Sequence, residues 1–183
     1  MLNVIETIKN MIKLTADDEP KAPLHVGEVM ALWTLSTLME EAVVFYGVFL
    51  NTTTDTELIK NINTAKKETS DVIQNLKEFL IKEGIPLPPT SEEKPLSNPG
   101  NVPYGVRFTD NEIANFLSVK TATYITFCGT ALAQTVRNDV AVMFLSFLTA
   151  VIQYSVNLKS LMIERSWLKV PPYFQPPGHP QDT

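Results

Sequence analysis

The chain has 183 residues, about the length of one domain, and can bury a sizeable core. Its net charge of −5 and its lack of a basic stripe exclude a protein that neutralises a nucleic-acid backbone. The one cysteine, Cys128, excludes a disulfide within the chain and fits an intracellular protein. Because Cys128 lies in an apolar helical stretch, we expect it to be a small buried hydrophobe.

The first segment, residues 1–14, is predicted to form a short amphipathic helix. It has no basic start, no continuous apolar run and no small-residue cleavage site, so we do not interpret it as a signal peptide. Its apolar residues recur close to helical spacing. They are Leu2, Val4, Ile5, Ile8, Met11 and Ile12.

Proline placement divides the rest of the chain. The 13 prolines fall between Pro20 and Pro23, between Pro86 and Pro103, and between Pro171 and Pro180. Proline breaks helix interiors, so long helices are expected in the proline-free blocks 24–85 and 104–170. Each block is long enough for two helices.

The first block is predicted to hold helix 1, at about 24–50, and helix 2, at about 55–83. The run Asn51–Asp55 between them is rich in turn and cap formers. Gly84 and the following Pro86 indicate the end of helix 2, since glycine readily adopts a positive φ. Helix 2 has an apolar seam at alternating spacings of four and three, typical of a bundle. The seam is Leu58, Ile62, Ala65, Thr69, Val72, Leu76 and Phe79.

Residues 84–108 form a long connection with six prolines and little periodicity. The run Thr109–Glu112 is a capping box, which predicts the start of helix 3, ending near Gln134. Helix 4 is predicted at about 138–166. The break before helix 4 is inferred from length, because one helix over 110–166 would be about 85 Å long.

The lengths of the connections predict the topology. Short turns make helices 1 and 2 antiparallel, and likewise helices 3 and 4. The middle connection could extend to roughly 80 Å, whereas a bundle helix is about 40 Å long, so it can cross the bundle. We therefore predict an all-α, ferritin-like four-helix bundle with one long crossover between helices 2 and 3. Residues 1–183 are interpreted as one domain, with an extended proline-rich tail at 167–183.

Two stretches carry no formal charge, Thr121–Val136 and Val140–Leu158. The second reaches the length of a membrane span. Interspersed polar residues and the amphipathic helix 2 favour a soluble protein, with a membrane hairpin as the alternative. Such apolar helices need extra cover from the N-terminal helix, the crossover, the tail or a second subunit. We expect a homo-oligomer that associates through helices 3 and 4.

The tail carries three aromatic residues among its prolines: Trp167, Tyr173 and Phe174. Because these side chains need cover, we predict that the tail straps across the bundle. The alternative is a polyproline ligand for another domain.

The motifs of common bundle chemistry are absent from the sequence. A di-iron centre needs Glu-x-x-His pairs, because residues three apart share a helix face, and no glutamate here is followed by histidine at that spacing. There is no glycine-rich phosphate loop, Cys-x-x-Cys pair or nucleophile elbow. We predict no catalytic residues, no cofactor and no enzymatic activity, and keep a bound metal as an alternative.

A polar cluster is expected at one end of the bundle. Parallel helices 1 and 4 would begin at that end, which brings Arg137 and Asp139 towards His25 and Glu28. We interpret the cluster as an ion-pair lock with a carboxylate at a helix terminus. A small anion or metal site is the alternative.

Two adjacent carboxylates, Glu40 and Glu41, interrupt the apolar helix 1 near its middle. At least one should face inward or towards a neighbour. A buried carboxylate needs a partner, and Lys120 lies at the same level. We favour a structural interpretation over a functional carboxylate.

Five segments together resemble an uncharacterised family of spore-forming bacteria whose members are often described as spore coat proteins. They are Leu24–Trp33, Glu83–Pro89, Thr109–Ala114, Val136–Val140 and Trp167–Tyr173. The similarity spans about residues 20–178 and implies a ferritin-like fold and a place in the spore coat, with other spore proteins as partners. It implies no active site.

The function predicted from the sequence is therefore that of a non-enzymatic structural or interaction protein associated with the spore. The alternative is a ferritin-like metal-binding protein with a degenerate or relocated site.

Overall fold

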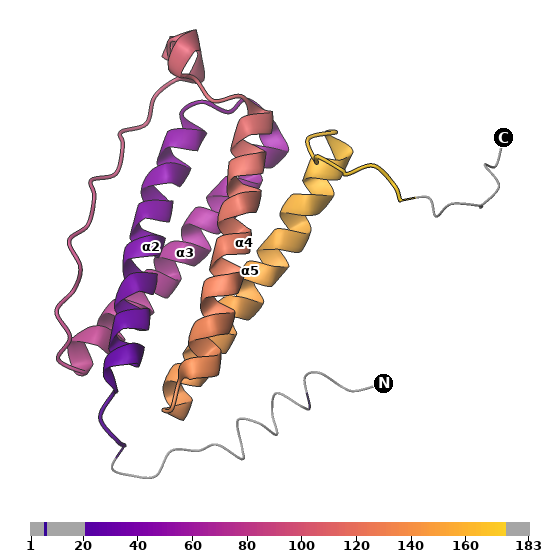
Figure 1. Cartoon of the computed structure of the whole chain (residues 1–183). Coiled ribbons are helices and arrows are strands. Elements are labelled where there is room, and N and C mark those ends of the chain that lie inside the picture. The colour runs from indigo at the N-terminus through magenta and orange to yellow at the C-terminus, as the bar shows by residue number, and fades with distance from the viewer. Residues whose placement is uncertain (1–5, 7–20, 175–183) are drawn as a thin grey trace.

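The computed structural model describes Glu6 and residues 21–174, and the predicted helix at 1–14 lies outside the described residues. Four long α-helices make up the described fold (Figure 1). They confirm the predicted all-α fold, and each begins and ends within two residues of its predicted position. They are α2 (Val26–Leu50), α3 (Thr56–Lys82), α4 (Asp110–Gln134) and α5 (Asn138–Glu164), with short 3-10 turns at Pro99–Asn101 and Tyr104–Val106.

The helix ends follow from local hydrogen bonding. Asp55 caps α3 by accepting from the backbone N–H groups of Glu57 and Leu58. Thr109 and Glu112 form the predicted capping box at the start of α4. Gly84 adopts a φ of +74° just after α3, the left-handed conformation that glycine tolerates best.

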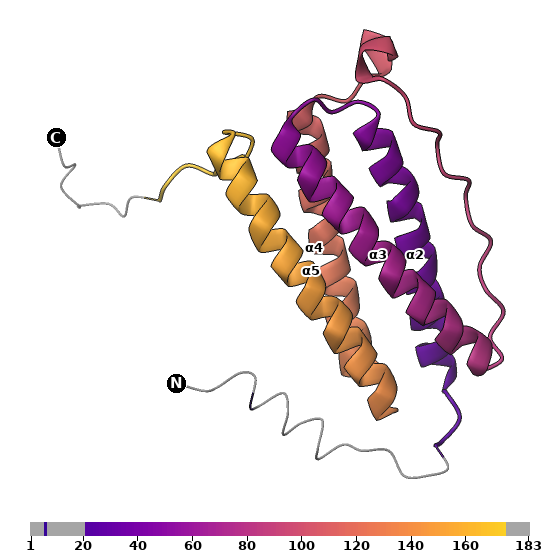
Figure 2. The ribbon, with the colours of Figure 1, turned by 180° about the vertical axis from the view of Figure 1, so that it is seen from behind.

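Two antiparallel pairs, α2 with α3 and α4 with α5, are joined by the long crossover (Figure 1). The crossover returns along the outer side of α2, so α4 begins at the same end as α3 (Figures 1 and 2). Ser91 of the crossover donates to Glu41 Oε1 at 2.6 Å, and Lys66 pairs with Glu93 at 2.6 Å. These contacts hold the crossover on α2 and α3 and away from α5.

The core lies between the four helices and is apolar. At the end of the bundle where α4 begins, Phe49 has no exposed surface and makes edge-on contacts with Phe108 and Phe116. Cys128 is also fully buried, as the sequence predicted. Burial raises the pKa of its thiol to about 11, which keeps the thiol protonated and unreactive at neutral pH.

Helix α5 is less covered than the other strongly apolar helix, α2. By length and composition, α2 and α5 could each cross a membrane, a test that core helices of soluble proteins also pass. In the most apolar 18-residue window, 39 % of α2 is buried but only 17 % of α5. The second half of the bundle therefore leaves an apolar surface open.

The tail does not strap across the bundle as far as Phe174. Trp167 and Leu168 pack against the core, and Asn115 donates to the Trp167 carbonyl at 3.1 Å. Beyond them Tyr173 and Phe174 are 90 % and 84 % exposed. The predicted strap is wrong for these two aromatic residues, because the chain leaves the bundle surface after Leu168 (Figure 1).

Candidate functional site

The polar cluster at one end of the bundle centres on the buried carboxylate of Glu28. Its Oε1 accepts from the backbone N–H groups of Val136 and Arg137, both at 2.8 Å. Its Oε2 accepts from the backbone N–H of His25 at 3.1 Å. Helix α5 has no side-chain cap from its own N-cap residue Arg137, and Glu28 places a negative charge at its N-terminus, where the helix dipole favours one.

His25 has a second role, as the N-cap of α2. Its Nδ1 accepts from the N–H groups of Gly27 and Glu28, at 3.0 and 3.3 Å. With Glu28 at the third helical position this is a capping box in which histidine stands where serine or threonine is usual. Histidine is not a common N-cap residue, so the sequence pattern did not reveal it.

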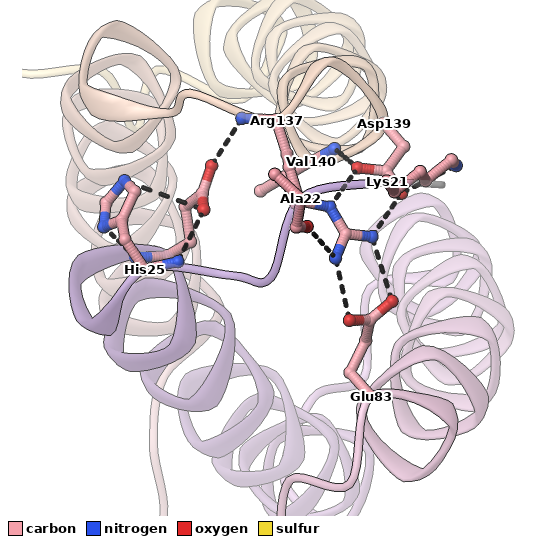
Figure 3. Close-up of polar contacts among 8 residues, drawn as sticks. Lys21, Ala22, His25, Glu83, Arg137, Asp139 and Val140 are labelled. Carbon is pink, nitrogen blue, oxygen red and sulfur yellow. Dashed lines mark hydrogen bonds and ion pairs between the residues drawn. The ribbon is translucent and has the colours of Figure 1, made fainter. Parts of the chain in front are cut away.

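Arg137 joins the C-terminal end of α3 to the start of α5 (Figure 3). Its guanidinium makes a bidentate pair with Glu83, at 2.8 and 2.9 Å, and a second with Asp139, at 3.0 and 2.7 Å. It also lies 5.7 Å from the centre of the Phe79 ring. Lys21 adds a further ion pair to Asp139 at 3.0 Å.

The charges in this cluster stabilise one another. Hydrogen bonds from Arg137 lower the pKa of Asp139 to about 2 and also lower the pKa of Glu83. Hydrogen bonds to Asp139 and Glu83 raise the pKa of Arg137. All three groups are therefore ionised at neutral pH, as expected of a lock between the C-terminal end of α3 and the start of α5.

The structure brings the four predicted residues His25, Glu28, Arg137 and Asp139 to one end of the bundle. They form two linked parts, the Glu28 cap and the Arg137 ion pairs. Sequence reasoning missed Glu83, although the same topology places the end of helix 2 beside the starts of helices 1 and 4. No group of three or more His, Cys, Asp or Glu side chains suited to a metal ion occurs among residues 21–174 or at Glu6.

The second pair of candidates, Glu40 and Glu41, faces two different partners. Glu40 pairs with Lys77 of α3 at 2.5 Å, and Glu41 accepts from Ser91. Lys120, the partner suggested by its helical level, lies close enough to Glu41 for the two charges to interact. Its Nζ also lies over two aromatic rings, 5.4 Å from the ring centre of Phe45 on α2 and 5.5 Å from that of Tyr124 on α4. The sequence did not indicate these aromatic contacts.

A cavity of about 70 Å³ lies in the middle of the bundle and is lined by all four helices. Its walls are mainly apolar, and three tyrosines, Tyr46, Tyr124 and Tyr154, stand among them. Bundle proteins build ligand sites in this region from side chains on facing helices. The sequence did not predict this cavity.

Residues 13–179 match the model of one protein family, described as "Protein of unknown function (DUF3231)". The chain belongs to the DUF3231 family. Its similarity to the uncharacterised protein YvdQ of Bacillus subtilis (strain 168) is 29 % identity over 150 residues, which cover 82 % of this chain and 88 % of YvdQ.

Solved structures share the fold of this DUF3231 chain. The structure titled "putative spore coat protein (BH2358)" from Bacillus halodurans C-125 has a TM-score of 0.82 and 32 % identity, covering 85 % of this chain and 98 % of that one. A conserved hypothetical protein, rv2844, from Mycobacterium tuberculosis has a TM-score of 0.61 at 12 % identity, covering 74 % and 96 % of the two chains. A DUF305 fragment from Deinococcus radiodurans has a TM-score of 0.62 at 9 % identity, covering 78 % and 99 %. The last two show the fold alone.

Proposed function

We propose that this DUF3231 protein is a non-enzymatic structural protein of the spore coat that assembles with copies of itself through α4 and α5. The observation that carries the proposal is the open apolar face of α5. Val142, Ile152, Val156 and Ile163 are 39 to 58 % exposed and lie within about 80° of one another around the helix, at 100° per residue. This α5 face needs a partner to be covered.

A second copy of the chain is the occupant that the charge pattern favours. Val142, Ile152 and Val156 lie in Val140–Leu158, which carries no formal charge, so this part of two such faces can meet without desolvating an ion. A two-fold axis lets the same patch serve both partners. The crossover cannot cover α5, because it runs along the far side of α2 (Figures 1 and 2).

The place in the spore coat is supported by the description of the Bacillus halodurans protein, which shares 32 % identity with this chain. The single long crossover supports grouping the bundle with ferritin-like proteins. In sporulating cells of a spore former, a fluorescent fusion of the full chain should gather at the surface of the developing spore. A fusion that stays diffuse through sporulation would contradict a coat role.

Sedimentation equilibrium of the purified full chain at micromolar concentration tests the assembly. We expect a mass of about 41 kDa, twice the 20.4 kDa of one chain. The double variant Ile152→Lys/Val156→Lys should sediment as a monomer with an unchanged helical circular dichroism spectrum. Asn63→Lys, at an exposed position on α3, is the matched control and should remain a dimer.

A monomeric wild-type chain would overturn assembly by self-association. If removal of residues 1–20 or 175–183 were instead needed to produce the dimer, those segments would be the normal cover of α5. A dimer that survives both α5 substitutions would place the interface on another face.

A further inference from the structure

The central cavity holds a polar atom that the described residues leave unsatisfied. The hydroxyl oxygen of Tyr154, on α5, is buried and has no hydrogen-bond partner among the described residues. A buried hydroxyl without a partner is costly, and such groups in native structures are usually satisfied by a water or a ligand. By contrast, the other two tyrosines of the cavity are satisfied, because Tyr124 donates to the Leu38 carbonyl and Tyr46 is hydrogen-bonded to Thr69.

The cavity has room for more than a single water. A volume of about 70 Å³ exceeds several-fold the roughly 10–15 Å³ that one water requires. Its opening lies between α3 and α5, where the lining residues Glu68 and Ala150 are exposed. Apolar residues from facing helices, Met39, Phe147 and Val151, form much of the wall.

The charges around the cavity do not favour an ionic ligand. Lys120 lines one side, where burial lowers its pKa and the nearby charge of Glu41 only partly opposes that effect. On the α3 side the charge of Glu68 acts on both Tyr46 and Tyr154. Burial also raises the pKa of Tyr154, so its hydroxyl remains a donor. An anion would face Glu68 and a cation would face Lys120, so neither sign of charge is favoured.

We infer that the cavity binds a small, neutral, largely apolar molecule with one hydrogen-bond acceptor, which takes the proton of the Tyr154 hydroxyl. Ketones, esters and ethers of about six non-hydrogen atoms belong to this class. The site is separate from the polar lock at the bundle end and from the exposed face of α5. It gives the bundle a binding activity in addition to assembly.

A matched series of five-membered rings tests the class of ligand by ¹H–¹⁵N NMR titration of the full chain. Cyclopentanone offers an acceptor, methylcyclopentane has none, cyclopentanecarboxylate is an anion and cyclopentylamine is a cation. We expect cyclopentanone to bind most tightly, with a Kd in the millimolar range for so few atoms. Its largest shifts should fall on residues that line the cavity.

The Tyr154→Phe variant tests the hydrogen bond, with Tyr104→Phe as the control on an exposed tyrosine. Loss of one hydrogen bond should weaken cyclopentanone binding about fivefold and leave methylcyclopentane unchanged. The variant should fold, because it removes only an unsatisfied hydroxyl. An anion or cation that binds as well as cyclopentanone would overturn the neutral class. An equal affinity in Tyr154→Phe would overturn the role of the hydroxyl, and no binding by any probe would mean that the cavity holds water only.

Discussion

At the scale of single residues, Glu28 shows how a buried charge becomes structural. Its side chain is 1 % exposed, yet both carboxylate oxygens accept backbone N–H groups from two parts of the chain that are more than 100 residues apart. Burying an unpaired carboxylate would be costly, and these N–H donors offset the cost of removing the Glu28 charge from water. Glu28 therefore holds the α4–α5 turn against the start of α2.

Glu28→Gln should destabilise the fold without changing its helical content. The amide keeps the shape but removes the charge and turns an N–H₂ group towards N–H donors. We expect the free energy of unfolding to fall by about 2–3 kcal/mol in urea titrations. Glu57→Gln, on the exposed first turn of α3, is the control and should change the urea midpoint far less. Equal effects of the two substitutions would show that the Glu28 hydrogen bonds contribute little.

The Asp139–Arg137 pair should make stability depend on acid pH. The pKa of Asp139 is lowered from its ordinary 3.8 to about 2 in the folded chain, first by hydrogen bonds from Arg137. A depressed carboxylate pKa gives stability that is present above pH 4 and is lost as the pH falls towards 2. The contribution is about 2 kcal/mol at neutral pH.

The measurement compares wild type with Asp139→Asn by urea titration between pH 7 and pH 2. Wild type should be more stable at pH 7, and the difference should shrink progressively below pH 4. A difference that stays constant with pH would show that the ionised form of Asp139 is not what stabilises the lock.

At the scale of elements, the sequence predicted the helices well because their ends depend on local chemistry. Thr109 and Glu112 make the capping box, and Gly84 takes the positive φ, within a few residues of chain. What was missed depends on packing across the fold. Lys77 pairs with Glu40 and Glu83 pairs with Arg137, and the sequence indicated neither pair. Such pairings follow from the relative rotation of helices, which a single sequence does not give.

The aromatic tail and the cavity show the same limit. Tyr173 and Phe174 are apolar enough to predict cover, yet the described chain leaves them exposed. The cavity depends on Tyr46, Tyr124 and Tyr154 coming to one level from three helices, which periodicity along one helix cannot indicate. Local sequence patterns therefore predict the helices and their connections, whereas the side chains that meet inside the bundle are known only from the structure.

Two glycines should respond in opposite ways to alanine. Gly84 lies at φ +74° with open space around it, so Gly84→Ala meets no clash but strains the backbone, costing about 1 kcal/mol. Gly129 lies inside α4, also with open space, so Gly129→Ala should stabilise the helix by up to about 1 kcal/mol. Thermal unfolding followed by circular dichroism should show the two midpoints moving in opposite directions. A shared direction would contradict this account of where α3 ends.

At the scale of the whole molecule, the core joins four helices through long-range contacts, and Cys128 lies fully inside it. Its thiol reacts only as the thiolate and only when exposed. A thiol reagent should therefore label Cys128 only in molecules whose bundle has opened. Helix α4 packs against both α5 and α2, so we expect that opening to be global rather than a fraying of α4.

In native buffer Cys128 should react with 5,5′-dithiobis(2-nitrobenzoate) roughly a thousandfold or more slowly than in denatured chain, given a stability of at least about 5 kcal/mol. The logarithm of the rate should rise with urea at the slope of global unfolding. A fast labelling rate that does not change with urea concentration would mean that α4 opens locally beside the cavity. In that case cyclopentanone at saturation should slow the labelling, because a ligand that fills the cavity stabilises the closed bundle.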